Sequence, residues 1–222
     1  MEAPTPAISW FTVLPLDGSP LMGRGCSVGL RGLVRLPREP SAAGIIVFSA
    51  AVGVVSMESV TLWGLLFAAA AVSLHVLTFD AAFDAAKRRC ARLVAAVASV
   101  NVLPYAAAFI LGRSAVAAAL LAYSPLFAGY TAAAVRGLLG TAMGYIADAA
   151  LLSYTAVLAS VLAGEPTTLT ITAAGLMALY TASTAAYVES RLPMRSTSPL
   201  LPLALWLPAL PLAAAVKPAL HC

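Results

Sequence analysis

The sequence predicts an all-α fold: a polytopic bundle of about seven transmembrane helices, with the N-terminus inside and the C-terminus outside. Apolar residues make up 61% of the chain and charged residues only 10%, whereas soluble domains usually contain about 25% charged residues. The apolar residues fall into seven runs separated by short polar breaks. The positive charges lie almost entirely in alternate breaks, as expected for a chain that crosses a membrane repeatedly.

The domain organisation follows from the length of helix that a bilayer requires, roughly 20 apolar residues at about 1.5 Å each. The N-terminal 40 residues contain no such run and predict a cytoplasmic tail rich in Gly and Arg. A transmembrane domain is predicted over residues 41–216, followed by a short external tail at 217–222. The predicted spans are 41–57, 60–79, 93–112, 114–135, 137–163, 169–188 and 200–216.

The first four spans end at charged residues. Glu58 begins a tight turn after the first span, and the longest polar break of the chain, residues 80–92, follows the second. The third span contains Pro104 and ends before Arg113, and the fourth ends at Arg136. A charged side chain is costly inside a bilayer, so each of these residues marks a boundary.

The last three spans are delimited by turns and prolines. Asp148 alone interrupts the fifth span, and a Gly-Glu-Pro-Thr-Thr turn at 164–168 precedes the sixth. A polar stretch at 189–199 leads into the seventh, which is short and contains three prolines.

The positive charges orient the predicted bundle. With the N-terminus inside and the spans alternating, the cytoplasmic breaks hold eleven of the thirteen Lys and Arg residues, and the outside keeps Arg113 and Lys217. Lys and Arg concentrate in cytoplasmic loops, so this pattern predicts a multi-pass protein of the cell membrane.

Composition also restricts the partners and cofactors. The net charge of +4 lies between apolar runs, without a basic patch interleaved with aromatic residues, so we expect the lipid bilayer and not nucleic acid as a partner. The three cysteines, Cys26, Cys90 and Cys222, form no C-x-x-C pair, which predicts unpaired thiols and no zinc site.

Asp148 is the first candidate for an intramembrane ion or proton site. A carboxylate near a helix centre costs roughly 2.5–3.5 kcal/mol on insertion scales, so we expect it to face protein or water. Gly140 and Gly144 recur with it every four residues and predict a face on which another helix packs closely. The alternative is a neutral carboxylic acid that holds two helices together through a hydrogen bond.

His75 and Asn101 are the other polar candidates within the spans. Asn101 lies three residues before Pro104, and a proline frees a backbone carbonyl one turn earlier that an amide can meet. Such breaks line cavities in transporters, although they also occur in ordinary membrane helices. His75 lies one turn before the end of the second span and could equally be a packing residue.

Asp80 and Asp84 support an alternative, enzymatic interpretation. Four residues apart, they share a face if the second helix continues beyond the membrane. Two carboxylates could bind Mg²⁺, and Lys87, Arg88 and Arg89 could then bind a phosphate. A helix-end charge cluster is the simpler interpretation. Apart from Mg²⁺ in this alternative, no cofactor is expected.

Residues 36–216 resemble the YwiC-like family of polytopic membrane proteins. Pro37-Arg38-Glu39 precedes the first span as in that family's Pro-Arg-Glu-His-Gly-Ala-Trp motif, whose second half is absent here. The segments Arg136–Leu139 and Tyr187–Leu192 are also similar. The resemblance implies a membrane protein of about seven spans without an assigned reaction.

A second resemblance is to the UbiA intramembrane prenyltransferases. Asp80 and Asp84 match one D-x-x-x-D step of that family's first Asp-rich motif, at the cytoplasmic end of the second helix. It implies a magnesium-dependent enzyme acting on a lipid or prenyl diphosphate. Three functions therefore stay open: a transporter-like or accessory protein for an ion or small molecule, this enzyme, or a structural membrane subunit.

Overall fold

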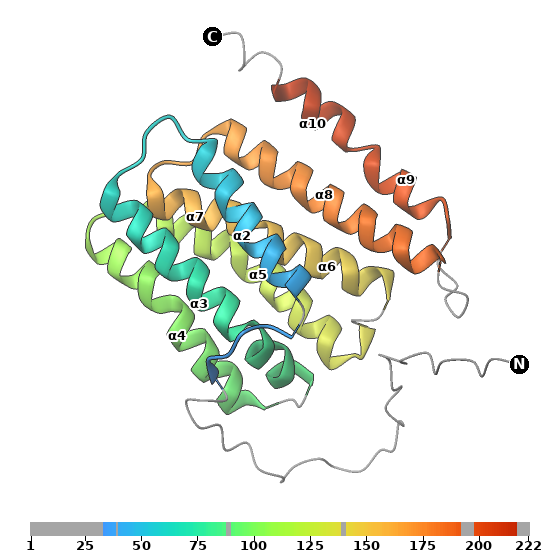
Figure 1. Ribbon diagram of the computed structural model, residues 1–222, viewed down its shortest axis with the longest axis horizontal. Helices are drawn as coiled ribbons and strands as arrows, with labels where there is room; N and C mark the ends of the chain where they lie inside the picture. Colours follow the sequence, from blue (N-terminus) through green and yellow to red (C-terminus); the bar gives the residue numbers. More distant parts are fainter. Residues whose placement is uncertain (1–32, 39, 88–89, 139–140, 192–197, 217–222) are drawn as a thin grey trace, which may run out of the picture.

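A computed structural model describes residues 33–38, 40–87, 90–138, 141–191 and 198–216 (Figure 1). Helices account for most of these residues, and no strand occurs among them. The helices are α2 (Pro40–Val55), α3 (Leu62–Lys87), α4 (Ala91–Ile110), α5 (Ala115–Val135), α6 (Ala142–Ser153), α7 (Thr155–Ala163), α8 (Thr168–Arg191), α9 (Leu201–Trp206) and α10 (Ala209–Val216). The predicted all-α class is confirmed.

Five helical stretches in the described part of the chain are long and apolar enough to cross a membrane. They are Leu62–Ala85, Arg92–Ile110, Ala115–Ala134, Met143–Ala163 and Thr168–Arg191, and they correspond to the second to sixth predicted spans. The first and seventh predicted spans are also helical but shorter. With 16 residues, α2 is about 24 Å long, against about 30 Å of hydrocarbon core. Seven full spans therefore stay a prediction.

Three helix boundaries differ from those predicted by three residues or more, for local reasons. Both α3 and α8 continue past the last apolar residue of their spans, because charged residues are compatible with a helix that enters water. The fifth predicted span begins later, at Ala142. Gly137 takes a left-handed φ of 71° after α5, which glycine adopts without strain, and the Thr141 side chain then caps α6 by accepting from the Gly144 N–H.

The helix pair α6–α7 forms the centre of the bundle. In its most apolar 18-residue window 72% of the residues are buried, against 17–33% in the other four membrane-length stretches. Every residue of α7 is buried, and α7 packs against α2, α3, α5 and α8. Figure 1 shows α4 and α9–α10 at opposite edges of the bundle. The α6–α7 pair is therefore surrounded by protein, whereas the other four membrane-length stretches have most of their apolar residues on the surface of the bundle.

Two glycines bring neighbouring helices into backbone contact with α7. A Cβ atom on Gly53 of α2 would lie 2.1 Å from the Ala156 carbonyl oxygen, and one on Gly64 of α3 would lie 2.4 Å from that of Ala163. The sequence had predicted close packing at Gly140 and Gly144 instead. Gly144 is buried in the first turn of α6, but Gly140 precedes the helix and lies outside the described residues, so that role stays a prediction.

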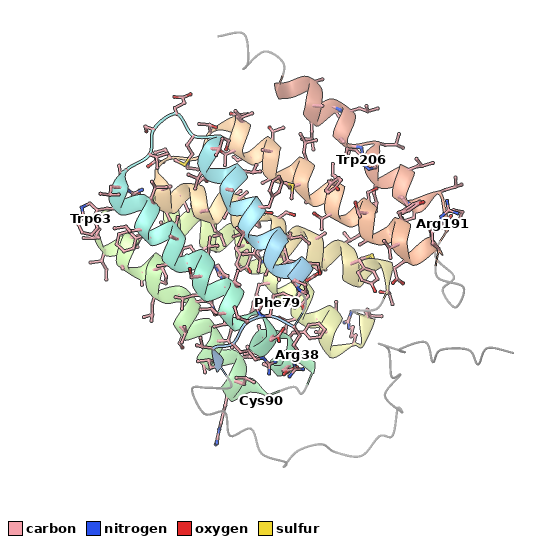
Figure 2. The ribbon with its side chains drawn as sticks, in the orientation of Figure 1. Arg38, Trp63, Phe79, Cys90, Arg191 and Trp206 are labelled. Atoms are coloured by element: carbon pink, nitrogen blue, oxygen red, sulfur yellow. The ribbon has the colours of Figure 1, made fainter. Side chains whose placement is uncertain are left out.

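The membrane-length stretches, of which α6–α7 is one, run alternately in opposite directions, so the bundle has two ends (Figure 1). One end, here called the basic end, holds the start of α2 and the ends of α3, α5 and α8. Six of the cations in the described part of the chain lie there: Arg35, Arg38, Lys87, Arg92, Arg136 and Arg191. Figure 2 places Arg38 and Arg191 at this end and Trp63 at the other. This separation agrees with the predicted alternation of charge.

One expectation about the cysteines was wrong. Cys90, which is buried at the start of α4, is disulfide-bonded, whereas the sequence analysis expected free thiols. The other two cysteines, Cys26 and Cys222, lie outside the described residues. The absence of a C-x-x-C pair was therefore not sufficient to predict the state of Cys90.

Candidate functional site

Four polar side chains meet between α3 and α4, inside the apolar bundle. His75 Nε2 lies 2.8 Å from Tyr105 Oη, and the Asn101 amide donates to Thr78 Oγ1 at 2.7 Å. We call these four residues the polar seam. The seam brings together two of the three residues that the sequence singled out within the spans, His75 and Asn101.

Helix geometry explains how the seam forms. Residues three or four apart share one face of a helix, so each of α3 and α4 contributes two of the side chains. Thr78 also donates to the Leu74 carbonyl at 2.7 Å, and Asn101 to the Val97 carbonyl at 2.9 Å. These bonds pair hydroxyl and amide donors that would otherwise be costly in an apolar interior.

One acceptor of the seam has no partner in the structure. Asn101 Oδ1 is buried and has no hydrogen-bond donor among the described residues. Leaving such a group unpaired costs about 1–3 kcal/mol, which a water molecule, a protonated group or a small cation would offset. Next to it, the buried Pro104 lacks an N–H and leaves the carbonyl one turn earlier without its usual helical donor. The seam thus has acceptor capacity for a small polar guest.

Two further tyrosines lie beyond the seam, against the hydrophobic core of the bundle. Tyr105 is 2% exposed and belongs to the main hydrophobic cluster, against which Tyr123 and Tyr154 also pack. The Tyr123 and Tyr154 rings are stacked with centroids 5.6 Å apart. Tyr154 donates to the Ala119 carbonyl at 3.2 Å. Polar groups therefore extend from α3 through α4 and α5 to the junction of α6 and α7.

Asp148 is half-buried on α6. Its helix packs against α8, α5 and α2, and Asp148 has interactions of its own there. The hydrogen bonds of the polar seam are made without it. The structure therefore does not join the three intramembrane candidates into one site.

A buried acid that the sequence analysis placed in a loop also belongs to the bundle. Glu189 is 5% exposed near the end of α8 and accepts a hydrogen bond from Tyr145 of α6 at 2.9 Å. The missed signal was a helical period: Ala182, Ala186 and Glu189 are spaced by four and three residues and are all buried.

Asp80 and Asp84 share a face of α3, as predicted for a helix that continues past the membrane, and both contact arginines. Arg35 Nη2 donates to Asp84 at 2.8 Å, and Arg35 Nε lies 3.2 Å from Asp80. The Arg38 backbone N–H donates to Asp80 at 3.1 Å. Residues 33–38, at the end of the predicted cytoplasmic tail, therefore pack on α3.

The magnesium site stays a prediction. In the part of the chain that the structure describes, no group of three or more His, Cys, Asp or Glu side chains could hold a metal ion. Lys87 is the last residue of α3, while Arg88 and Arg89, the other predicted phosphate ligands, lie outside the described residues.

No protein-family model, curated protein or solved structure matches this chain.

Proposed function

We propose that this chain is a transporter-like or accessory integral membrane protein whose polar seam passes a proton between the two ends of the bundle. The apolar helices indicate a lipid bilayer as its environment. The observation that carries the proposal is the His75–Tyr105 hydrogen bond, 2.8 Å long within two membrane-length helices. Polar and ionisable residues within membrane helices are expensive and usually functional.

The chemistry of the seam suits a proton better than a larger solute. Histidine can accept a proton on one ring nitrogen and release one from the other. Tyr105 Oη lies within hydrogen-bond distance of His75 Nε2, so a proton can move between them along an existing bond. The unpaired Asn101 Oδ1 can hold the water that extends this path.

Proton flux into liposomes tests this function. The purified protein is reconstituted with internal pyranine, and a potassium gradient with valinomycin drives protons inward. We expect a faster internal pH change than in protein-free liposomes. His75→Ala and Tyr105→Phe are expected to slow it at least about tenfold, since proton-transfer groups typically contribute 10²–10⁴-fold.

Thr172→Val is the matched control for this assay. Thr172 is buried and donates a hydrogen bond to the Thr168 carbonyl on α8, away from the seam. The proton flux of this variant should therefore equal that of wild type. A wild-type rate equal to that of empty liposomes, or variants as fast as wild type, would overturn the proposal. A structural subunit would then be the better interpretation.

The orientation of the protein is a separate prediction. The basic end of the bundle should face the cytoplasm, because Lys and Arg are retained on that side. Alkaline phosphatase fused after Lys87 should be inactive, and a fusion after Gly112, before Arg113 at the opposite end, should be active. The reverse result would place the basic end outside, where a disulfide at Cys90 would be ordinary, since disulfides are rare in the cytosol.

The magnesium-dependent enzyme has weaker support. Asp80 and Asp84 would have to exchange their contacts with Arg35 for metal coordination. The YwiC-like resemblance agrees with a polytopic membrane protein but assigns no reaction.

A further inference from the structure

The segment before α2, residues 33–38, is attached to α3 and α4 at the basic end. We call it the N-terminal strap. Leu33 is 7% exposed and belongs to an apolar cluster that includes Ala81 of α3 and Val97 of α4. The Arg35 backbone N–H donates to the Leu77 carbonyl at 2.9 Å. Figure 1 shows the strap as a blue trace that crosses the end of α3 on its way to α2.

Ion pairs fasten the strap to the face of α3. The Arg35 guanidinium contacts both Asp80 and Asp84, and Arg38 Nε lies 3.7 Å from Asp80. The Arg35 and Asp84 side chains are 28% and 27% exposed, whereas Asp80 is 9% exposed. The Arg35 Nη2–Asp84 contact is also a hydrogen bond, 2.8 Å long, and charge-assisted hydrogen bonds are shorter and stronger than neutral ones. Because water reaches part of the cluster, salt can weaken it.

The strap lies over the basic end of the polar seam. Leu77, which accepts from the strap, directly precedes Thr78 of the seam. Val97, which belongs to the same apolar cluster as Leu33, provides the carbonyl that Asn101 binds. The strap therefore covers both α3 and α4 at positions within one helical turn of the polar groups of the seam. A proton or water arriving from the basic end meets the strap first.

We propose that the N-terminal strap is a gate on the polar seam, and that the contacts of Arg35 with Asp80 and Asp84 are its latch. With the latch formed, Leu33 and the strap backbone exclude water from the end of the seam. With it broken, the apolar contact of Leu33 and the backbone hydrogen bonds of Arg35 and Arg38 hold the strap less tightly, and water reaches the seam. The gating role rests on the proposed function, whereas the covering of the seam does not.

Cysteine accessibility measures the cover directly. Ala81→Cys is introduced beneath the strap in a chain whose native cysteines are replaced by Ser, and labelling with a charged methanethiosulfonate is timed in detergent. Arg35→Gln and Asp84→Asn should each speed labelling about tenfold or more, the range expected for a lost charge-assisted hydrogen bond. Ser114→Cys, exposed at the opposite end of the bundle, should react equally fast in all three chains.

Hydrogen exchange provides a second measurement with all native cysteines present. The Arg35 amide, bonded to the Leu77 carbonyl, should exchange about tenfold faster in Asp84→Asn than in wild type. Equal labelling of Ala81→Cys with and without the latch, or equal exchange of the Arg35 amide, would overturn the cover.

Proton flux then separates the cover from the gate. A faster flux in Arg35→Gln, together with faster labelling, supports the gate. Faster labelling with unchanged, measurable flux overturns the gate and leaves a cover only. Faster labelling with no flux in any chain, wild type included, overturns the proposed proton function while the cover stands.

Discussion

Gly53→Ala is expected to destabilise the bundle by about 3 kcal/mol or more, at the upper end of the usual cost of overpacking. The new Cβ would lie 2.1 Å from the Ala156 carbonyl oxygen and 2.7 Å from its carbonyl carbon. These are backbone atoms of the buried helix α7, so no side chain can rotate away. Helices α2 and α7 would have to move apart, and their close backbone contact at Gly53 would be lost.

Gly44→Ala on the same helix is the matched control. Nothing lies within 4 Å of a Cβ at Gly44, so the substitution should stabilise the protein by about 0.5–1 kcal/mol through helix propensity alone. Unfolding by SDS titration in mixed micelles, followed by circular dichroism, compares the two variants. A Gly53→Ala protein at least as stable as wild type would show that α2 and α7 do not pack as described.

Leu162→Ala is expected to lower the free energy of unfolding by about 2 kcal/mol, which is near the low end of the range for buried leucines in soluble proteins. The side chain is fully buried in α7, so its removal leaves a cavity. In a membrane, however, the reference state also keeps the leucine in an apolar environment, and packing rather than transfer from water drives helix association. The cavity therefore accounts for most of the expected loss.

The control for this variant is Leu121→Ala. Leu121 of α5 is 75% exposed on the bundle surface, where lipid or detergent replaces the deleted atoms, so we expect a change within about 0.5 kcal/mol. Thermal unfolding of the purified protein in detergent measures both. Equal losses for the two leucines would mean that α7 is not the central helix.

The candidate site was predictable only in part. His75 and Asn101 stood out because they are polar residues inside apolar runs, and that signal is present in the sequence. Their partners, Thr78 and Tyr105, gave no such signal, since threonine and tyrosine are ordinary in membrane helices. Their pairing depends on how α3 and α4 are aligned along their length, which the loop between them does not specify.

The N-terminal strap was missed for a related reason. Arg35 and Arg38 were predicted to belong to a cytoplasmic tail, because the first 40 residues contain no apolar run of membrane length and are rich in Gly and Arg. Their contacts with Asp80 and Asp84 join residues more than 40 positions apart. Neither the arginines of the tail nor the Asp80–Asp84 pair indicates that these two distant segments contact each other. The spacing of the two carboxylates predicted only that they share a face of one helix.

The sequence alone determined that this chain is all-α, that its long apolar runs are helices, and that most cations in the described part of the chain gather at one end of the bundle. These properties are local or additive: apolar length, helix periodicity and charge between spans suffice to infer them. Only the tertiary structure decided that α6–α7 is the central helix pair, that Gly53 and Gly64 are the close contacts, and that the strap covers the seam. In a chain this rich in alanine and leucine, most helix faces are chemically alike, so side-chain fit selects which of them meet.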